Sequence, residues 1–440
     1  MSIELLHCYT VTLLIIQGVD VKIKLFCYNG STMNQHQHFD IVILGAGIGG
    51  YETFRSLTRL LKKSKSHKTI AIVDQNDYFG FTPLFHEAAS GSIEPVHCAI
   101  PLTEVVQKTN HSFIKAGVKN VDPEKKTVTT DQGEITYNYC VVALGSNVNY
   151  YNIPGAQQHS YSVRTLADAI KLKEHFISKA EKNDSLSVSV VGGGFTGVEV
   201  AGQFAYTVKY RLKKLFRRKK FELNLIQNAP SIVPSLSEKV RKKISARLRD
   251  LGVKIYLKAE VKEVQDSKVL LNGNGLASDI TIWCAGNKNI ADRFFDKKYC
   301  ENGRLPVTEF LNFPLDENIY AVGDIVLGHN PNDQVLFPQL GEAAHKEGQY
   351  AAKHIFAQIK NRPIRPFRFH SKGILMPVGD KFGIAIFDGF IFNGILAWLL
   401  RRTVYILFMP GIILRLRIII DWTLRLLGLQ YLLDPLLKRK

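Results

Sequence analysis

The chain has 440 residues, of which 46% are apolar, 22% are charged and 10% are aromatic. At ~150 residues per compact unit, this length predicts roughly three units. The apolar content excludes an intrinsically disordered, collagen-like or low-complexity chain. No uninterrupted apolar run reaches the ~18–20 residues that a membrane-spanning helix requires, which excludes a multi-span transporter.

Lys and Arg number 57 against 39 Asp and Glu, which gives a formal net charge of +18. Two segments carry most of this excess. Residues 207–220 hold eight basic residues and no acid, and residues 401–440 hold eight basic residues against Asp421 and Asp434. A basic surface favours an anionic partner, and composition alone leaves nucleic acid and phospholipid open. We expect the run at 207–220 to be a solvated helix face rather than a lipid contact.

The chain contains six scattered cysteines: Cys8, Cys27, Cys98, Cys140, Cys284 and Cys300. No two of them form a C-x-x-C pair, which argues against a zinc module and a redox-active dithiol. This usage indicates reduced thiols in a protein that faces the cytosol. Cys140 and Cys284 lie within apolar runs, where a core position is expected, and no metal site is predicted.

Residues 1–38 fit the rest of the chain poorly. The apolar run Thr10–Ile16 lacks the basic region and the small-residue cleavage site of a signal peptide, so no cleaved export signal is predicted. We expect a loosely ordered N-terminal extension.

A strand–glycine–helix–strand pattern follows this extension. Phe39–Gly50 is an apolar strand that runs into a glycine turn, a helical stretch extends to about Lys63, and Thr69–Asp74 is a second strand. In the turn G-x-G-x-x-G, the first glycine permits the tight bend, the second lets the backbone approach a pyrophosphate, and the third lets the helix pack closely on the strand. The turn and the acid Asp74 that ends the second strand therefore predict a dinucleotide site.

The same pattern recurs as Leu186–Ala205 followed by Phe221–Gln227, where Gln227 replaces the strand-terminal acid. The spacing of the two turns predicts that the second nucleotide domain is inserted into the first. Further on, Asn318–Val326 is a predicted strand and turn, and Ala343–Ile359 is a predicted helix. Arg362–Phe367, with two prolines, is a predicted linker.

Two dinucleotide sites in one chain imply a flavoprotein that passes a hydride between a nicotinamide and a bound flavin. The predicted fold class is α/β, with two Rossmann-like domains and a C-terminal amphipathic, helical membrane-anchoring region. The predicted boundaries are 39–150 and 291–365 for the two parts of the FAD domain, 151–290 for the NAD(P)H domain, and 366–440 for the anchoring region.

The C-terminal segment consists of apolar stretches, Gly389–Leu400, Arg401–Leu414 and Arg415–Leu433, interrupted by arginines. Each stretch is too short to span a bilayer. Such segments suit helices that lie in the membrane interface, with apolar faces in the acyl region and arginines at the headgroups. A buried pair of dimerisation helices is the alternative. We expect removal of residues 385–440 to release the protein from membranes while NADH still reduces the flavin.

Several segments together give the chain a family resemblance. FDIVILGAGIGGYETFRSL, FTPLFHEAASGSIEP, VVALGS, VVGGGFTGVEVAGQF, TIWCAGN and NIYAVGDIV resemble type II NADH:quinone oxidoreductases, the single-subunit respiratory NADH dehydrogenases. The resemblance covers about Phe39 to the C-terminus. FTPLFHEAASGSIEP is its most specific segment, since the glycine turns are shared with all flavoproteins that bind two dinucleotides.

The resemblance implies roles for individual residues. One set would bind FAD: Gly45, Gly47, Gly50, Asp74, Thr82, Pro83, Leu84, Gly145, Gly323 and Asp324. A second set would bind NADH or approach the cofactors: Gly192, Gly194, Gly197, Gln227 and Gly286. Glu199 would border the contact between nicotinamide and flavin, and the alternative for it is a first-turn acid that only complements the helix dipole.

The chain departs from the family at the quinone-site pattern A-Q-x-A-x-Q-Q. Gly341, Glu342, Ala344, Lys346 and Glu347 occupy the patterned positions, so charged residues replace glutamines. We expect Glu342 and Lys346 to form an i, i+4 pair near the flavin's quinone side that assists proton delivery.

The sequence therefore predicts a monotopic enzyme on the cytoplasmic face of the cell or inner membrane. It would pass a hydride from NADH, with some use of NADPH, to tightly bound FAD and then two electrons to ubiquinone or menaquinone, without pumping protons. A phospholipid surface and a second copy of the chain are expected partners, and nucleic acid is not. The alternatives are a sulfide:quinone oxidoreductase, a ferredoxin or rubredoxin reductase, and a non-enzymatic, NADH-sensing membrane flavoprotein.

Overall fold

The computed structural model describes residues 36–212, 219–387 and 389–427. Of the predicted N-terminal extension 1–38, residues 1–35 therefore lie outside the described part of the chain. Strand β1 (His36–Leu44) begins earlier than the predicted boundary at residue 39, because His36, Gln37 and His38 already pair in parallel with β8 (Gly133–Val142).

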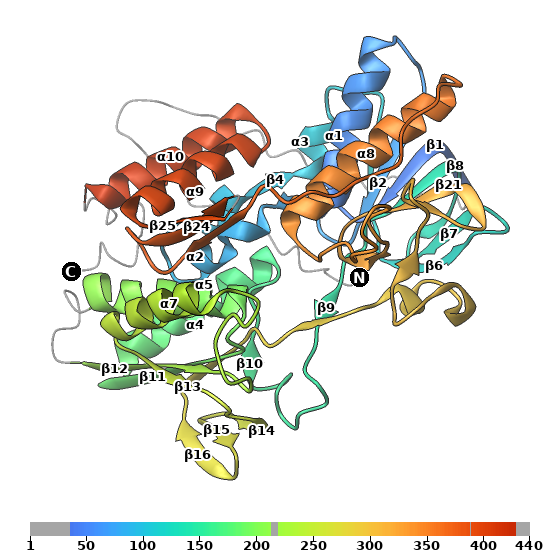
Figure 1. The fold of residues 1–440 in the computed structure, drawn as a ribbon. Coiled ribbons are helices and arrows are strands. Elements are labelled where there is room, and N and C mark those ends of the chain that lie inside the picture. Colours follow the sequence, from blue (N-terminus) through green and yellow to red (C-terminus); the bar gives the residue numbers. More distant parts are fainter. Residues whose placement is uncertain (1–35, 213–218, 388, 428–440) are drawn as a thin grey trace, which may run out of the picture.

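The first sheet carries the first glycine turn. Its strand order is β20 (Asn312–Phe313), β21 (Asp316–Ala321), β8, β1, β2 (Ile70–Asp74), β5 (Ser112–Lys115), and β6 (Val118–Asp122) and β7 (Thr127–Thr130) extend it beside β8. Helices α1 (Ile48–Lys63) and α8 (Gly341–Ile359) lie side by side on this sheet (Figure 1). The apolar side chains alternate along β1, so Ile41 and Ile43 join the core that contains α1 and α8, while Val42 and Leu44 join the core on the other face.

The second sheet is parallel and has the order β10 (Ser160–Tyr161), β17 (Ile280–Trp283), β11 (Ser185–Val191), β12 (Lys220–Ile226), β13 (Val253–Tyr256). Helices α4 (Leu166–Lys182), α5 (Phe195–Thr207) and α7 (Glu238–Asp250) cover one face. A three-stranded antiparallel sheet, β14 (Val261–Gln265), β15 (Lys268–Leu271) and β16 (Asn274–Ala277), packs toward the other face.

The two sheets are joined by a pair of crossing segments. β9 (Asn147–Val148) leaves the first sheet and pairs antiparallel with β18 (Asn287–Lys288), which returns to it. Every strand of the second sheet lies between these two segments in the sequence. The first sheet then continues with β21, as its register with β8 shows.

Short elements complete the first nucleotide-binding unit: β3 (Tyr78–Gly80), η1 (Thr82–Leu84), α2 (Phe85–Ala89), η2 (Pro95–Cys98), β4 (Ala99–Pro101), α3 (Leu102–Val106), β19 (Leu305–Pro306), η6 (Gly323–Ile325) and β22 (Val326–Leu327). The π-helix η3 (Val208–Leu212) follows α5, and residues 213–218 of the predicted solvated helix face at 207–220 lie outside the described part of the chain.

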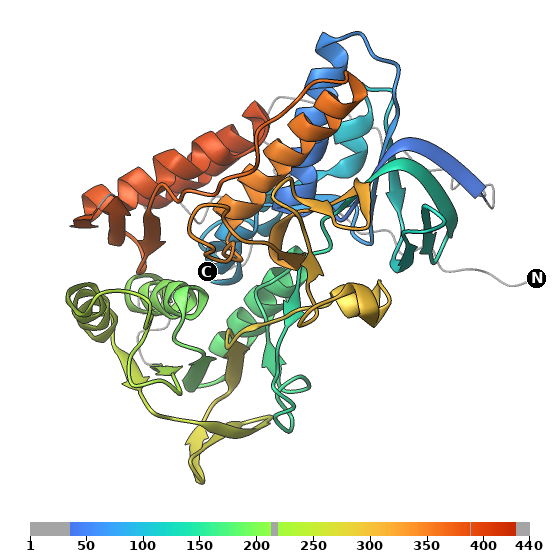
Figure 2. The same cartoon turned by 45° about the vertical axis from the view of Figure 1, so that its right-hand side comes forward.

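The C-terminal region differs from its predicted division. It forms an antiparallel sheet, β23 (Ile374–Pro377), β24 (Gly383–Phe387) and β25 (Phe390–Gly394), followed by helices α9 (Ile395–Phe408) and α10 (Ile412–Leu426). The sequence predicted interfacial helices over Gly389–Leu400, Arg401–Leu414 and Arg415–Leu433, whereas residues 390–394 form a strand and one helix runs through Arg401. The helices break instead at Pro410 and Gly411, because proline lacks a backbone N–H and Gly411 has a positive φ of +74°. Figure 2 shows α9 and α10 along one side of the molecule.

Among the described helices, none is long and apolar enough to cross a membrane.

Candidate active site

The first glycine turn has the geometry of a dinucleotide-binding loop. Gly45 adopts φ +96°, a conformation that side chains disfavour. A Cβ at Gly47 would meet nothing within 4 Å, whereas a Cβ at Gly50 would collide with the carbonyl oxygen of Gly45. The loop thus leaves open space at its second glycine and packs tightly at its third, as a pyrophosphate cradle requires. FAD fits this cradle.

Asp74 ends β2 beside this turn. Its carboxylate accepts a hydrogen bond from the Ala46 N–H at 2.7 Å and another from the Asn76 N–H at 2.7 Å. Burial raises the pKa of Asp74, although these N–H donors oppose the shift. The acid therefore lies at the rim of the cradle, where a ribose diol of a bound dinucleotide is expected.

The second turn repeats this geometry. Gly192 adopts φ +104°, a Cβ at Gly194 would meet nothing within 4 Å, and a Cβ at Gly197 would collide with the Gly192 carbonyl oxygen. Gln227 follows β12 and accepts a hydrogen bond through Oε1 from the Gly193 N–H at 2.8 Å. It thus holds the same place in the second turn that Asp74 holds in the first, without the negative charge.

Gln227→Glu should reduce activity with NADPH by at least ~10-fold relative to activity with NADH, because a carboxylate repels the 2′-phosphate that NADH lacks. Glutamate keeps the oxygen that accepts from Gly193, so the loop itself should be preserved. We expect wild-type protein to favour NADH and still oxidise NADPH. Comparison of kcat/KM for the two nucleotides checks this, and equal losses with both would contradict it.

A third group of predicted residues lies beyond the carboxyl ends of the neighbouring strands β8 and β21. Gly145 has φ +70° and open space around a Cβ position. Ser146 donates through Oγ to Asp324 Oδ2 at 2.7 Å, and the Arg164 guanidinium lies 3.5 Å from the same oxygen. This arrangement fixes Asp324 in η6, shortly after β21, where the ribityl and phosphate part of FAD would lie.

Glu347 of α8 supports the adjacent Gly323. Its carboxylate, which is almost fully buried, accepts a hydrogen bond from the Gly323 N–H at 2.6 Å, and burial raises its pKa to about 8. Gly286, also predicted at the site, lies where the chain returns along β18, and its carbonyl accepts from the Asn149 N–H at 3.0 Å.

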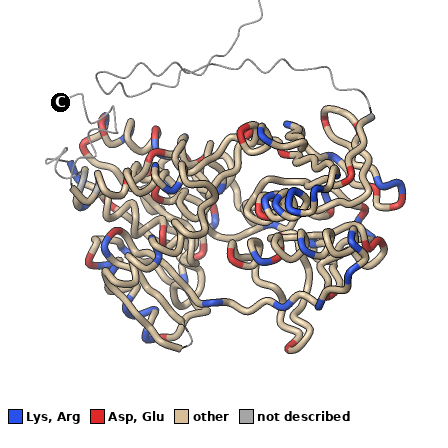
Figure 3. The backbone as a smooth tube through the Cα atoms, turned by 90° about the horizontal axis from the view of Figure 1, so that it is seen from above, with Lys and Arg blue, Asp and Glu red and all other residues tan. Residues whose placement is uncertain are grey.

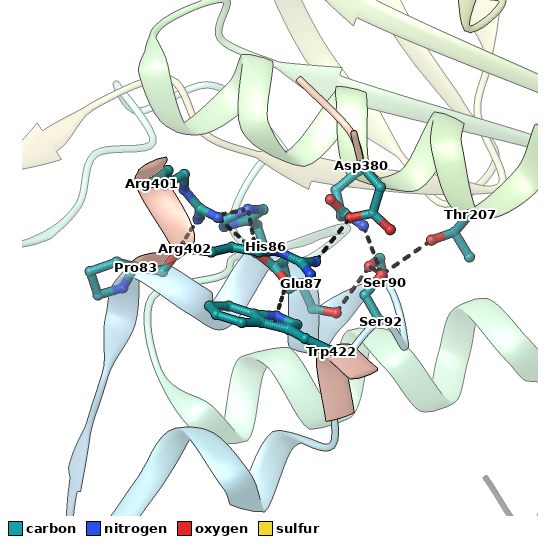
Figure 4. A network of polar contacts seen from close by, with 11 residues as sticks. Pro83, His86, Glu87, Ser90, Ser92, Thr207, Asp380, Arg401, Arg402 and Trp422 are labelled. Carbon is teal, nitrogen blue, oxygen red and sulfur yellow. Dashed lines mark hydrogen bonds and ion pairs between the residues drawn. The ribbon is translucent and has the colours of Figure 1, made fainter. Parts of the chain in front are cut away.

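The predicted flavin-facing segment is η1 with α2. Thr82 is exposed, Pro83 is half-buried, and Leu84 belongs to the apolar core. The carbonyl oxygen of Pro83 accepts a hydrogen bond at 3.2 Å from Arg401, which lies on the C-terminal helix α9. The C-terminal region thus reaches directly into this segment (Figure 4).

Arg401 forms a buried ion pair beneath the predicted flavin segment. Its Nη1 donates to Glu87 Oε1 at 2.8 Å, and the two side chains are 1% and 2% exposed. Trp422 of α10 donates through Nε1 to the other oxygen of Glu87 at 3.1 Å. The prediction that Arg401 and Arg402 lie at lipid headgroups was therefore wrong, because both are buried.

Arg402 lies between two aromatic rings. Its guanidinium is 3.7 Å from the ring centre of Trp398 and 4.3 Å from that of Trp422, and it is 3.6 Å from Asp380. Asp421 of α10 also accepts from His97 at 2.8 Å if the Nδ1 proton is present. These contacts fix α9 and α10 on the body of the protein.

Polar contacts continue from α2 into the second nucleotide domain. The hydroxyl groups of Ser90 and Ser92 lie 2.7 Å apart (Figure 4). Gln203 of α5 donates a hydrogen bond to Ser92 at 2.8 Å. Segments from both nucleotide domains and the C-terminal region therefore share one buried polar network.

Glu199 lies in the first turns of α5 and is half-buried. Burial raises its pKa to about 7, the positive charge of Arg401 opposes the shift, and Glu87 adds to it. Burial, with a contribution from Glu199, also raises the pKa of the Cys284 thiol. Glu199 thus shares its surroundings with the Arg401–Glu87 pair.

We expect Glu199→Gln to remove a pH limb near 7 from the reduction of bound FAD by NADH. The wild-type rate should rise as pH increases through about 7, the pKa of Glu199. Ionised Glu199 would favour the positive charge that develops on the nicotinamide, and loss of one such group costs roughly 10-fold or more. Stopped-flow bleaching of the flavin across pH measures the limb. A glutamine variant that keeps both the limb and the rate would assign Glu199 to the helix-dipole role.

Glu342 and Lys346 form the predicted pair, with Nζ and Oε1 2.8 Å apart. Both side chains also contact the segment after the linker: Glu342 accepts from the Lys372 N–H at 3.0 Å, and Lys346 donates to the His370 carbonyl. Although burial acts to raise the pKa of Glu342, its contacts with Lys346 and residues 371–372 lower it overall. The pair therefore ties α8 to the chain that leads into the C-terminal sheet.

Sequence reasoning missed Glu87 and the inward direction of Arg401. FTPLFHEAASGSIEP contains Glu87, but no local pattern distinguishes a buried acid from a surface one. The doublet of arginines inside an apolar stretch was the available signal, since a cation in such a stretch must find either a headgroup or a buried acid.

Comparison with known proteins places the chain among flavoproteins. It is 26% identical to demethylphylloquinone reductase NdbB of Synechocystis over 88% of the chain and 96% of the relative, and 23% identical to the type II NADH:quinone oxidoreductase of Staphylococcus saprophyticus over 83% and 93%. The fold matches the NADH complex of NDH2 from Plasmodium falciparum with a TM-score of 0.77 at 20% identity, over 90% of the chain and all of that structure. Residues 39–348 match the pyridine nucleotide-disulphide oxidoreductase model, so the chain belongs to that family.

Proposed function

We propose that this protein oxidises NADH through bound FAD and reduces a membrane quinone, without pumping protons, while lying on one face of the membrane. The two glycine turns supply the sites for FAD and NADH. The named relatives, a demethylphylloquinone reductase and NADH:quinone oxidoreductases, act on quinones by name and support this acceptor. When bound, FAD accepts the hydride and passes on two electrons.

The observation that carries the proposal is a broad apolar surface on the C-terminal region. It comprises the exposed apolar side chains of β25, α9 and α10: Phe390, Phe392, Ile395, Leu396, Leu399, Leu400, Leu407, Phe408, Ile412, Ile413, Leu416, Ile419, Ile420 and Leu426. Soluble monomers rarely gather so many exposed large apolar side chains on consecutive elements. We call it the apolar face. It lies on the same helices that hold Arg401 beside Pro83 and Glu87, so a lipid-soluble acceptor would enter next to the cofactor sites.

Changing three residues of the apolar face to aspartate, Leu396→Asp, Ile413→Asp and Leu416→Asp, should weaken membrane binding by more than ~100-fold. These side chains are 71%, 63% and 51% exposed, so the folded body should lose little stability. Sedimentation with phospholipid vesicles measures the binding.

Leu315→Asp is the matched control, because Leu315 is 72% exposed and lies on the first nucleotide domain. The control should bind vesicles like wild-type protein, and the triple variant should unfold at the wild-type temperature. A folded triple variant that still sediments with vesicles would refute the membrane role of the apolar face.

Glu342 and Lys346 support proton delivery to the reduced quinone in this proposal. They form a half-buried ion pair on α8, whose Ala344 faces the Gly323 turn. Glu342→Gln should alter the pH dependence of quinone reduction.

The central test is steady-state oxidation of NADH and NADPH by detergent-solubilised protein, with ubiquinone and menaquinone analogues. NADH oxidation that depends on added quinone is the expected result. Flavin that is bleached by NADH and not reoxidised by any quinone would favour a soluble-acceptor reductase or an NADH sensor.

A sulfide:quinone oxidoreductase is the second candidate, since it would use the same fold and membrane face. Such chemistry needs a cysteine pair beside the flavin. The cysteines that the structure describes, Cys98, Cys140, Cys284 and Cys300, are all free, and Cys140 is fully buried in β8. Sulfide-dependent quinone reduction in the same assay would overturn the NADH assignment. The homodimer and the cytoplasmic membrane face also remain proposals, which light scattering and protease protection would test.

A further inference from the structure

The apolar face has a charge pattern that selects among membranes. In residues 389–427, which the structure describes, the acid is Asp421, and it is buried against His97. Arg401 and Arg402 are also buried and pair with Glu87 and Asp380. Two cations of α10 remain at the surface among the side chains that the structure describes. They are Arg415 and Arg417.

These two arginines border the apolar face on α10. At ~100° per residue around a helix, Ile412, Leu416, Ile419 and Ile420 project to one side, and Leu414, Ile418 and Trp422 project to the protein core. Arg415 and Arg417 fall on opposite edges of the exposed arc, roughly a quarter-turn or slightly more from its centre. A helix that lies in the interface places its apolar arc among acyl chains and its flanking arginines at the level of the headgroup phosphates.

The two arginines differ in what else they contact. Arg415 donates to the carbonyl oxygens of Met409 at 2.9 Å and Leu407 at 3.1 Å, and so caps the end of α9. Arg417 is exposed and has no hydrogen bond or ion pair with any residue that the structure describes. Its charge is therefore available to a partner outside the protein.

Figure 3 shows Lys and Arg interspersed with Asp and Glu along the rest of the chain. The exposed apolar face, by contrast, is bordered on α10 by cations and by no exposed acid within residues 389–427. A zwitterionic bilayer offers no net attraction to such a border, whereas an anionic bilayer does. A nucleic-acid partner matches it less well, because the area between the arginines is aliphatic.

We propose that the apolar face docks on a bilayer that contains anionic phospholipid, and that the charge of Arg417 is attracted to the net negative charge of that surface. This inference rests on the proposed membrane function and adds the chemistry of the lipid. Each arginine near an anionic surface strengthens binding by about 5-fold, and the effect is screened by salt.

The test is sedimentation of the full chain with two kinds of vesicle, phosphatidylcholine alone and an equal mixture of phosphatidylcholine and phosphatidylglycerol. Wild-type protein should bind the mixed vesicles more tightly, and added salt should reduce that excess. Arg417→Gln should lose about 5-fold of the affinity for mixed vesicles and keep its affinity for phosphatidylcholine. Arg417→Lys should restore binding, and Arg59→Gln, at an exposed position of α1, is the matched control.

The outcomes separate the two proposals. Equal, salt-insensitive binding to both vesicles would overturn the lipid selectivity and leave membrane docking intact. An Arg417→Gln protein that binds both vesicles more weakly by the same factor would show that Arg417 acts through packing, which also overturns it. Failure of wild-type protein to bind either vesicle would contradict the membrane part of the proposed function itself.

Discussion

Arg401→Met should destabilise the protein by about 3–5 kcal/mol, because removing one partner of a buried ion pair leaves the other charge uncompensated. Glu87 is 2% exposed, and the substitution would remove the guanidinium that lies 2.8 Å from its carboxylate. Methionine keeps most of the side-chain volume, so the loss should come from electrostatics rather than from a cavity. Urea unfolding of the FAD-loaded protein measures the change.

The matched control is the double variant Glu87→Gln with Arg401→Met. Removing both charges should recover a large part of the lost stability, since replacing a buried pair by neutral groups is often close to neutral. A change of less than ~0.5 kcal/mol in the single variant would show that solvent reaches the pair. The same contacts revise an expectation from the sequence. Deleting residues 385–440 would remove Arg401 and Trp422, which bind Glu87, and so would disturb the body of the protein. The aspartate variants of the apolar face are therefore the cleaner test of membrane binding.

Gly50→Ala and Gly197→Ala should separate the two nucleotide sites. Each added Cβ would collide with a backbone carbonyl oxygen, that of Gly45 in the first turn and that of Gly192 in the second. Backbone cannot yield as a flexible side chain does, so each turn should open and lose the geometry of its phosphate cradle. We expect Gly50→Ala to be purified largely without FAD, and Gly197→Ala to keep FAD while its reduction by NADH falls at least ~100-fold.

Flavin absorbance after purification and stopped-flow reduction by NADH measure these effects. Gly252→Ala is a control for glycine substitution outside both sites, since a Cβ there meets nothing within 4 Å, although its φ of +91° will cost some stability. FAD loss from Gly197→Ala, with FAD retained by Gly50→Ala, would reverse the assignment of the two turns.

Local sequence patterns determined the parts of this protein in which a short segment contains its own physical reason. The predicted strand and turn at Phe39–Gly50, the helix that ends at Lys63 and the second strand ending at Asp74 are all present. Tight turns, strand hydrophobicity and helix starts depend on neighbouring residues, so they can be read without the rest of the fold. The same holds for the place of Gln227, which is set by the end of β12.

Only the tertiary structure decided where the charges of the C-terminal region lie. An arginine in an apolar helix is satisfied equally by a lipid phosphate or by a buried carboxylate, and the choice depends on an acid more than 300 residues away in the sequence. Arg401 meets Glu87 and is buried, whereas Arg417 meets no described acid and stays at the surface. The hydrophobic pattern of α9 and α10 determined that they are amphipathic. The packing of the C-terminal sheet against α9, and of η2 against α10, decided which of their faces the protein covers and which it leaves for a membrane.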